Sequence, residues 1–430
     1  MMTDRRKFIK QTAWAAGGAM VLPTIIPACV KGANDRVNIG MIGMGSHGLS
    51  YNHKNYIGID ACRIVAVCDV DAQRLQKAAA ITNKKYQNQD VSLYSDFREL
   101  LLRKDIDAVQ ISTPDHWHVH LSILAMQAGK HVCCEKPTLT IEQGRILVDQ
   151  IKKNEKVFQS SLEDRSLQPY HRMAELVRNG RIGKLQKMRV GLPGQYSLNY
   201  NPDTTVQSVP DYFDYEMWLG PAPYAPYSPG RCHWNFRWID ALSGGSLADW
   251  GAHLIDDAQW CNGTEKWGPI EVEGVGSRPS EGIYDAFNTY RLTYRYENGV
   301  ELQVHGDSIE IYCEGSDGWL QVEGWNQKLL ASSDEILHSE IGEKEVHLYT
   351  AMNEHVNFVE CIKEGKEPYH PAEDMHRTAT MAHMGNIAMK LQNKLKWDPN
   401  KEEFIDNDEA NRMRSRPDRN PWLLKDIINE

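Results

Sequence analysis

The stretch "VNIGMIGMGSHG", residues 37–48, limits the possible folds of this 430-residue chain more than any other. It begins as an apolar run typical of a buried strand and continues with the spacing Gly43-x-Gly45-x-x-Gly48, after which a helical pattern starts. At such a corner the first glycine permits a tight turn, the second lets the backbone approach a phosphate, and the third lets helix and strand pack closely. The spacing therefore predicts the first strand, turn and helix of a Rossmann dinucleotide-binding domain.

Short β-type runs alternate with helical runs through the first part of the chain. The runs typical of strands are "RVNIGMI", "RIVAVCD", "DAVQIS" and "HVCCE", and the runs "DAQRLQKAAAITNK" and "WHVHLSILAMQAGK" between them are typical of helices. This alternation indicates an α/β domain with a doubly wound parallel sheet. We assign this domain to residues 34–160.

Beyond residue 160, several β-type runs follow one another without helices between them. They include "LQKMRVGL", "TYRLTYRYENGVELQVHG" and "IEIYCEGSDGWLQVEG", and the Asn-Gly pair in the second run is a hairpin signal. Helical patterns return at "AMNEHVNFVECIKEG" and "EDMHRTATMAHMGNIAMKLQNK". We therefore expect residues 161–430 to form an α+β substrate-binding domain with a mostly antiparallel sheet and C-terminal helices.

The first 33 residues have the features of an export signal and linker. Arg5 and Arg6 precede the uncharged run "AWAAGGAMVLPTIIPA", which is short for a membrane span and is broken by glycines and prolines. Twin arginines before such a run predict the twin-arginine route and a periplasmic protein. The sequence "IIPAC" also resembles a lipoprotein cleavage site, which leaves a lipid anchor at Cys29 as an alternative to a free protein.

Charge and cysteine usage exclude several classes of partner. The net charge of -10 argues against nucleic acid and anionic lipid, because both require a concentrated basic surface. A small neutral or polar ligand fits better. The cysteines at 62, 68, 133 and 134 lie in or beside apolar, strand-like runs and no CxxC pair occurs, so we predict no disulfide scaffold and no bound metal.

The glycine loop defines a candidate cofactor site. The backbone of the loop and the start of its helix would contact the phosphates through Gly43, Met44, Gly45, Ser46, His47 and Gly48. Asp69 ends the second strand, where an acid accepts hydrogen bonds from the adenosine ribose and repels a 2′-phosphate. This position favours NAD, while Arg74, one helical turn beyond, leaves NADP as an alternative.

The run "STPDHWHVH" follows the fourth strand at the edge where such sheets bind ligands. Thr113, Pro114 and His116 are therefore added to the predicted cofactor contacts. Asp115 resembles a helix N-cap, and a helix starting there points His118 away from the two other histidines. We therefore interpret this run as solvent or cofactor-edge contacts and not as a metal site.

At "HVCCEKP" the chain resembles the Gfo/Idh/MocA family of oxidoreductases. Glu135-Lys136-Pro137 behind the glycine loop carries the resemblance, together with "RCHWNFRW", "GGSLADWGAHLIDDAQW", "EGSDGWLQV", "NFVECIKEGKEP" and "GNIAMKL". The resemblance implies a Rossmann domain joined to a domain with a large open sheet, activity on sugars or polyols with NAD or NADP, and homo-oligomers formed through that sheet. It also implies that exported members bind their cofactor tightly before export.

The same resemblance implies roles for individual residues. Glu135 and Lys136 would contact the cofactor, Lys136 would lie beside the nicotinamide and the reacting hydroxyl, and Asp249 and His253 match the family's catalytic aspartate and histidine. Many relatives have a glutamine where Glu163 and Asp164 stand, which leaves the role of this segment open.

The spacing of the run 244–260 supports these roles independently. Asp249, His253 and Asp256 are i, i+4 and i+7, so they share one face of a helix. A histidine can take the hydroxyl proton, the carboxylate one turn away can fix its tautomer, and Lys136 can stabilise the alkoxide. Whether the lysine or the histidine is the immediate base stays open. Asp256 is a substrate contact in this interpretation, whereas Asp257 is equally suited to a helix surface.

Further substrate contacts are predicted around this helix. The three tryptophans 234, 238 and 250 offer flat surfaces for sugar rings, although each could equally be a core residue. Polar contacts to hydroxyl groups are assigned to His233, Asn235 and Arg237, and Trp234 and Arg165 complete the predicted substrate-binding residues.

The sequence therefore predicts an NAD(P)-dependent oxidoreductase that moves hydride between nicotinamide and a secondary hydroxyl of a sugar, sugar derivative or glycoside, with C3 as the hypothesised carbon. One alternative is a glycoside hydrolase that works by transient oxidation and elimination, although such enzymes often differ at "DWGAH". The other alternative is a non-catalytic sugar-binding protein that keeps a nucleotide for structure.

Overall fold

The structure is a computed structural model that describes residues 35–194 and 203–429. The predicted export signal, with Arg5, Arg6 and Cys29, lies outside the described residues. Within the described ranges, no helix is both long enough and apolar enough to cross a membrane. Every cysteine in these ranges is a buried free thiol.

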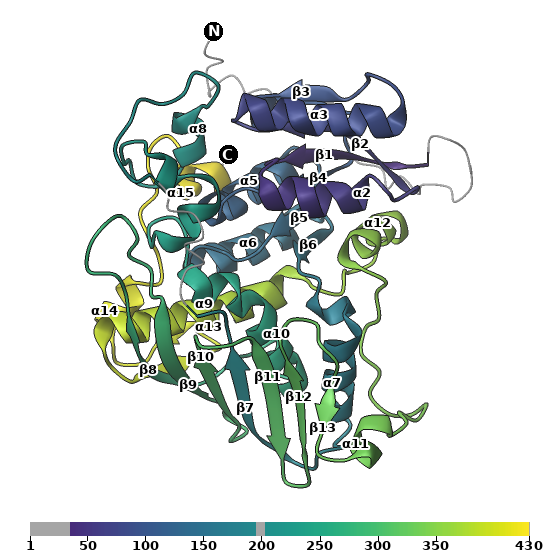
Figure 1. Cartoon of the computed structure of the whole chain (residues 1–430), viewed down its shortest axis with the longest axis vertical. Coiled ribbons are helices and arrows are strands. Elements are labelled where there is room, and N and C mark those ends of the chain that lie inside the picture. The colour runs from purple at the N-terminus through teal and green to yellow at the C-terminus, as the bar shows by residue number, and fades with distance from the viewer. Residues whose placement is uncertain (1–34, 195–202, 430) are drawn as a thin grey trace.

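The first half of the chain forms a six-stranded parallel sheet in the order β3-β2-β1-β4-β5-β6 (Figure 1). Its strands are β1 Val37–Ile42, β2 Cys62–Cys68, β3 Ser92–Tyr94, β4 Ala108–Ile111, β5 His131–Glu135 and β6 Phe158–Ser161. The helices between them are α2 Lys54–Tyr56, α3 Ala72–Tyr86, α4 Phe97–Leu101, α5 Asp115–Gln127 and α6 Ile141–Asn154, with a π-helical turn at Gly48–His53 before α2. The strand order reverses between β1 and β4, which is where such sheets bind ligands.

Helices cover both faces of this sheet. Apolar side chains of α4, α5 and α6 pack on one face, and those of α2 and α3 pack on the other. Two elements from the far end of the chain join these layers: α12 Glu354–Glu364 on the α2 side and α15 Leu424–Ile428 beside α5. The C-terminal part of the chain therefore stabilises the dinucleotide-type sheet as well as its own. The predicted division at residue 160 stays a prediction.

The second sheet has nine strands in the order β13-β12-β11-β7-β10-β9-β8-β14-β15. Its strands are β7 Leu185–Gly191, β8 Glu271–Ser277, β9 Thr289–Arg295, β10 Glu301–His305, β11 Glu310–Gly315, β12 Trp319–Glu323, β13 Leu330–Ala331, β14 Leu395–Asp398 and β15 Glu403–Phe404. All neighbours are antiparallel except β7 and β10. The predicted Asn-Gly hairpin joins β9 to β10, with Gly299 at φ 86°. The fold class predicted from the sequence is confirmed.

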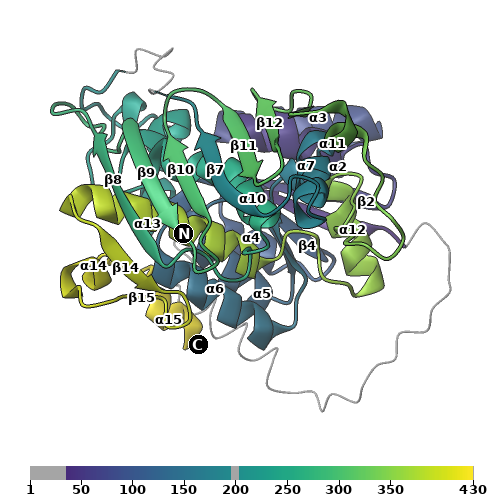
Figure 2. The same ribbon diagram turned by 90° about the horizontal axis from the view of Figure 1, so that it is seen from below.

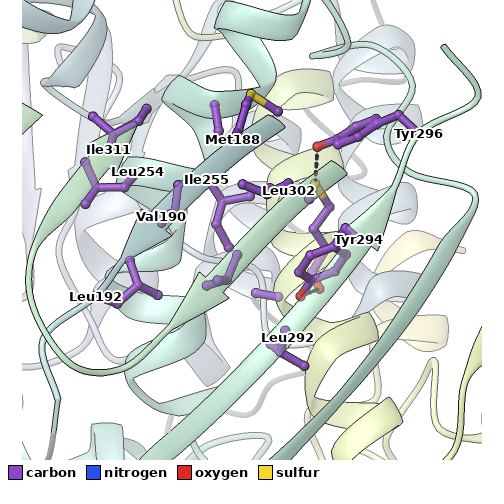
Figure 3. Close-up of a cluster of buried hydrophobic side chains, with 14 of the residues drawn as sticks. Met188, Val190, Leu192, Leu254, Ile255, Leu292, Tyr294, Tyr296, Leu302 and Ile311 are labelled. Atoms are coloured by element: carbon purple, nitrogen blue, oxygen red, sulfur yellow. Dashed lines mark hydrogen bonds between the residues drawn. The ribbon is translucent and has the colours of Figure 1, made fainter. Parts of the chain in front are cut away.

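Three helices cover one face of this sheet, namely α7 Gln168–Arg178, α10 Gly251–Asn262 and α13 Ala372–Leu391 (Figure 2). Alternate strand residues such as Val190, Leu302 and Ile311 point towards Leu254 and Ile255 of α10 (Figure 3). Full burial of each such side chain contributes roughly 1.5–3 kcal/mol. The opposite face is partly exposed and carries a polar ladder.

This polar ladder includes Arg189, His305 and Glu310. The Arg189 Nε to Glu310 Oε1 distance is 2.7 Å, and the His305 Nε2 to Glu310 Oε1 distance is 3.0 Å. The two faces of the sheet thus differ in chemistry, because side chains alternate along each strand.

Replacement of neighbouring residues on β10 tests this assignment of faces. We expect Leu302→Ala to lower the free energy of unfolding by about 2–5 kcal/mol, because the fully buried side chain leaves a cavity. The matched control Gln303→Ala, on the opposite face, should change it by less than about 0.5 kcal/mol. Urea denaturation followed by tryptophan fluorescence measures both, and equal effects would contradict the register.

Candidate functional site

A cavity of about 310 Å³ lies where the two halves of the molecule meet. From the first sheet it receives the segments that follow the carboxyl ends of β1, β2, β4, β5 and β6. From the second half it receives the 3-10 helix His233–Trp238, the start of α10, and the loop after β12. The cavity therefore joins the predicted cofactor edge to the run 244–260.

The glycine loop is built as its spacing predicts. Gly43 has φ 89°, and a Cβ atom there would lie 2.6 Å from the Ser112 carbonyl oxygen. A Cβ atom at Gly48 would lie 2.2 Å from the Gly43 carbonyl oxygen. Gly45, Ser46 and His47 line the cavity with these two glycines, whereas the Met44 side chain is buried in the core. A side chain does not fit at Gly43 or Gly48, because the backbone segments approach each other too closely there.

Asp69 follows β2 and lines the cavity beside Arg74, as predicted. Its Oδ2 accepts a hydrogen bond from the Met44 backbone N–H at 2.6 Å, and its Oδ1 accepts one from the Asp71 N–H at 2.8 Å. Burial raises the pKa of Asp69 to about 6. The carboxylate thus holds the glycine loop, and because each oxygen has a second lone pair, it can accept further hydrogen bonds from a ligand.

The histidines after β4 differ from the prediction. Thr113 and Pro114 line the cavity, but His116 does not, because its Nε2 contacts the Trp218 carbonyl oxygen at 3.0 Å in a buried position. His118 lines the cavity instead, held at 2.8 Å by the carbonyl oxygens of Thr113 and Pro137. The expectation of solvent or cofactor contact is therefore wrong for His116, since the first turn of α5 directs it towards α8 Tyr215–Leu219.

The N-cap of α5 is also corrected. The helix begins at Asp115 and its N-cap is Pro114, so Asp115 already lies inside the helix. Its Oδ2 accepts a hydrogen bond from the Ser243 hydroxyl at 2.6 Å. This acid therefore links the first half of the molecule to the second.

Lys136, which follows β5, forms an ion pair with Asp249. The lysine Nζ lies 2.8 Å from Asp249 Oδ1 and 2.9 Å from the Asp249 carbonyl oxygen, and Arg237 Nε lies 3.1 Å from Asp249 Oδ2. Burial alone would raise the pKa of Asp249, but the two cations hold it well below its ordinary value. Burial alone would lower the pKa of Lys136, yet Asp249 and Glu135 raise it. The lysine is therefore a fixed cation on the cavity wall.

His253 lines the cavity, but its partner is not the predicted one. Its Nδ1 lies 2.7 Å from Oδ2 of Asp164, a fully buried residue that follows β6. The expectation that Asp249 fixes the tautomer is corrected, because Asp249 contacts Lys136 and Arg237 and forms no hydrogen bond with His253. Burial lowers the pKa of His253 to about 4.

The run 244–260 does not form one continuous helix. Its first helix, α9 Gly245–Asp249, ends before α10 begins at Gly251.

Arg165 and Asp256 are structural residues and not substrate contacts. The two side chains form a bidentate pair, with Nε to Oδ2 at 2.7 Å and Nη2 to Oδ1 at 2.8 Å, and Arg165 also contacts Asp374 at 2.7 Å. Asp257 is buried as well, which excludes the alternative of a helix-surface position. All of them point away from the cavity, because this part of α10 packs between α7 and α13.

The aromatic run 231–238 divides between cavity and core. His233, Trp234 and Arg237 line the cavity, and the Arg237 guanidinium stacks 4.3 Å from the centre of the Trp234 ring. Asn235 does not line it, and Trp238 is buried. A 3-10 helix directs successive side chains to different sides, which explains the split.

Several cavity residues were not predicted from the sequence. Trp325, in the loop after β12, packs against both Trp250 and His253, with ring centres 5.4 and 5.0 Å apart. Glu163 lines the cavity beside His253, and no side chain of the described residues donates a hydrogen bond to its carboxylate. The position of Glu163 and Asp164 after a parallel strand was a signal for both, whereas nothing local marks Trp325.

Glu163, Asp164 and His253 also meet a distance criterion for holding a metal ion, because one ligand atom from each lies within 4.8 Å of the others. In this structure the Nδ1 to Oδ2 contact of 2.7 Å already joins two of the three. We therefore assign His253 and Asp164 to a hydrogen bond.

Curated relatives match over about a third of the chain. The D-glucoside 3-dehydrogenase of Escherichia coli (strain K12) is 31% identical over 165 residues, which is 37% of this chain and 45% of that protein. The "Glycosyl hydrolase family 109 protein 2" of Shewanella sp. (strain ANA-3) is 36% identical over 139 residues, 31% of this chain and 29% of that protein. These matches span less than half of each relative.

Solved structures match over most of the chain. The WlbA dehydrogenase from Bordetella pertussis in complex with NADH and UDP-GlcNAcA has a TM-score of 0.64 at 18% identity and covers 84% of this chain and 99% of that chain. A levoglucosan dehydrogenase in complex with NADH and L-sorbose has a TM-score of 0.63 at 19% identity with the same coverage. At these identities the likeness shows the fold.

Two family profiles complete the comparison. Residues 37–162 match the Gfo/Idh/MocA profile described as "Oxidoreductase family, NAD-binding Rossmann fold". Residues 170–424, more than half of the chain, match the profile described as "Oxidoreductase family, C-terminal alpha/beta domain". The chain therefore belongs to the Gfo/Idh/MocA family of oxidoreductases, as the Glu-Lys-Pro and Asp-x-x-x-His motifs implied.

Proposed function

We propose that the protein oxidises or reduces a secondary hydroxyl of a sugar, sugar derivative or glycoside, with C3 as the reacting carbon. One observation carries this proposal: Lys136 from the first half and His253 from the second face the same cavity as the glycine loop. The name of the D-glucoside 3-dehydrogenase supports the substrate class and the carbon.

The residues of the first sheet fit an NAD cofactor. The backbone around Gly43 and Gly48 leaves no room for side chains, which is the form of cradle that a pyrophosphate needs, and Asp69 is placed for the ribose. Thr113 and Pro114 border the same cavity beside Lys136. When bound, NAD accepts or returns the hydride of the reacting carbon. We propose that NAD is bound tightly and that the acid disfavours NADP.

The protein's own groups then handle the sugar and the proton. Trp234, Trp250 and Trp325 offer aromatic surfaces to the sugar ring. Lys136, fixed by Asp249, is a cation that stabilises negative charge on the reacting oxygen. His253 is uncharged near neutral pH, because burial lowers its pKa to about 4, so it is able to accept the hydroxyl proton.

A second candidate function is glycoside hydrolysis by transient oxidation and elimination. Two observations favour it: several relatives are named as glycosyl hydrolase family 109 proteins, and Glu163 provides an unpaired carboxylate beside His253 that could remove a second proton. The retained "DWGAH" run counts against it.

We also propose a cellular setting. The chain is exported by the twin-arginine route to the periplasm, with a lipid anchor at Cys29 as a further possibility, and it forms homo-oligomers through the polar face of the nine-stranded sheet. The motif at Arg5-Arg6 and the family resemblance support this setting.

The first prediction from the proposed function concerns turnover. Purified protein supplied with NAD should form NADH with at least one member of a panel of glucosides and free sugars. His253→Ala should lower kcat by about 10²- to 10⁴-fold through loss of proton transfer, while NAD binding is kept. The exposed His338→Ala is the control and should leave kcat unchanged.

The products separate the candidate functions. NADH together with a keto-sugar supports the oxidoreductase, and aglycone release without net NADH supports the hydrolase. Binding without turnover across the whole panel would support the non-catalytic alternative and contradict the proposal.

The second prediction concerns cofactor choice. The wild type should bind NAD at least about tenfold more tightly than NADP at pH 8, since the charged Asp69 repels the 2′-phosphate. Because the pKa of Asp69 is raised to about 6, the carboxyl becomes neutral below that pH and the preference should weaken there. In Asp69→Asn the change of this preference with the charge of Asp69 should be absent. Calorimetric titration measures the affinities for NAD and NADP. If their ratio in the variant equals that of the wild type, another group determines the selectivity.

The third prediction concerns export. Replacing Arg5 and Arg6 by lysine should keep the protein in the cytoplasm of a bacterial host, as cell fractionation with immunoblotting would show. Cys29→Ala should move the protein from the membrane to the soluble periplasmic fraction if the cysteine is lipidated. Light scattering of the purified protein reads the oligomeric state.

A further inference from the structure

Asp249 is paired with two cations and not with His253. Its Oδ1 accepts a hydrogen bond from Lys136 at 2.8 Å and its Oδ2 accepts one from Arg237 at 3.1 Å. Although Asp249 and His253 are four residues apart in sequence, no hydrogen bond joins them. The histidine must therefore be oriented by another group.

Asp164 is in contact with the ring of His253. It begins the 3-10 turn Asp164–Ser166 after β6 and is fully buried, and its Oδ2 lies 2.7 Å from His253 Nδ1. Its Oδ1 has no hydrogen-bond partner among the described residues. This carboxylate is thus available to the histidine alone.

Two tryptophans confine the same ring. Trp250 lies 5.8 Å and Trp325 lies 5.0 Å from it, centre to centre, and Trp325 meets it edge to face at 83°. With Nδ1 bonded to Asp164, the remaining ring nitrogen, Nε2, has no partner in the described part of the chain. His253 lines the cavity, so Nε2 is the nitrogen that can meet a ligand.

We propose that Asp164 is the positioning residue of His253: it keeps a proton on Nδ1, so that Nε2 is left with a lone pair that accepts the proton of the substrate hydroxyl. This inference rests on the proposed oxidoreductase function and assigns a role that the family's Asp-x-x-x-His motif does not contain. A carboxylate that fixes the tautomer of a histidine base has the same effect in hydrolases.

The hydroxyl O–H bond breaks and its proton forms an N–H bond at His253 Nε2. The same carbon loses a hydride, which NAD+ accepts, so the substrate loses one proton and one hydride and becomes a ketone. The Asp164–His253 pair changes from one net negative charge to neutral.

Burial favours this change of charge, because an uncompensated charge is costly away from water. Burial and the neighbouring Asp256 raise the pKa of Asp164, so the pair as a unit binds a proton more readily than an exposed carboxylate and histidine would. The charged and titratable groups that face the pair from the surrounding elements are Glu135, Lys136, Glu163, Tyr170, Asp249, Asp256, Asp257, Tyr369 and His370. The acids among them outnumber the single lysine, which strengthens the base.

The first test compares Asp164→Asn with Asp257→Asn. Asp257 is the matched control, because it is a buried acid of α10, the helix that carries His253, and it forms no hydrogen bond with His253. Asp164→Asn should lower kcat by about 10²- to 10⁴-fold with KM and NAD affinity changed less than about threefold. The acidic limb of its pH–rate profile should move to lower pH by about one unit or more, since the amide no longer stabilises the imidazolium. Asp164→Glu should restore part of the rate.

The second test uses the wild-type protein, so it does not depend on whether a variant at position 164 folds. The 15N NMR shifts of His253 in the wild type, assigned by their absence from His253→Gln, should report a neutral ring with the proton on Nδ1 at pH 7. A proton on Nε2 would overturn the proposal. So would a folded Asp164→Asn with wild-type kcat and pH profile, or with losses equal to those of Asp257→Asn.

The two tests also separate this proposal from the proposed function. If the wild type shows no redox turnover with any sugar, the proposed function fails, while the tautomer measurement still decides whether Asp164 positions the ring. If the wild type turns over but His253 carries its proton on Nε2, only the positioning role fails.

Discussion

The ion pair between Lys136 and Asp249 is the interaction on which the site depends. The two residues are 113 positions apart, one at the end of β5 and the other at the end of α9, and both side chains are nearly buried. Removal of Asp249 would leave Lys136 and Arg237 without their shared counter-ion at low dielectric, which typically costs several kcal/mol. The pair therefore fixes how the two halves meet as well as the charge of the cavity wall.

Other buried polar contacts reinforce the same junction, and α13 takes part in several of them. Arg145 of α6 contacts Glu373 of α13 at 2.8 Å and Glu402 at 2.6 Å, and His376 of α13 contacts Glu402 at 2.8 Å. Arg165 bridges Asp256 and Asp374. Because these groups are satisfied by one another, they lock α10 and α13 against the segment after β6, which is the segment that carries Glu163 and Asp164.

The polar residues of the run 249–257 have different partners in the structure, although their spacing predicts a shared helix face. Sequence spacing placed Asp249, His253 and Asp256 on one face, and an isolated helix would present all three to the same neighbour. In the folded chain each acid meets a different partner: Asp249 meets Lys136, and Asp256 meets Arg165. His253 is left to pair with Asp164, from an element that lies 89 residues earlier.

Local sequence determined the elements and the cofactor edge, because their causes are local. Glycines at 43 and 48 are required wherever backbones approach within contact distance, alternation of residue types determines which face of a strand is buried, and an acid that ends β2 always lies at the carboxyl edge. Only the tertiary structure decided the pairing of charges, the burial of Arg165 and Asp256, and the arrival of Trp325 beside His253. These features depend on contacts between residues tens to hundreds of positions apart in sequence. A buried charge needs an opposite charge close by in space, whatever the distance between the two residues along the chain.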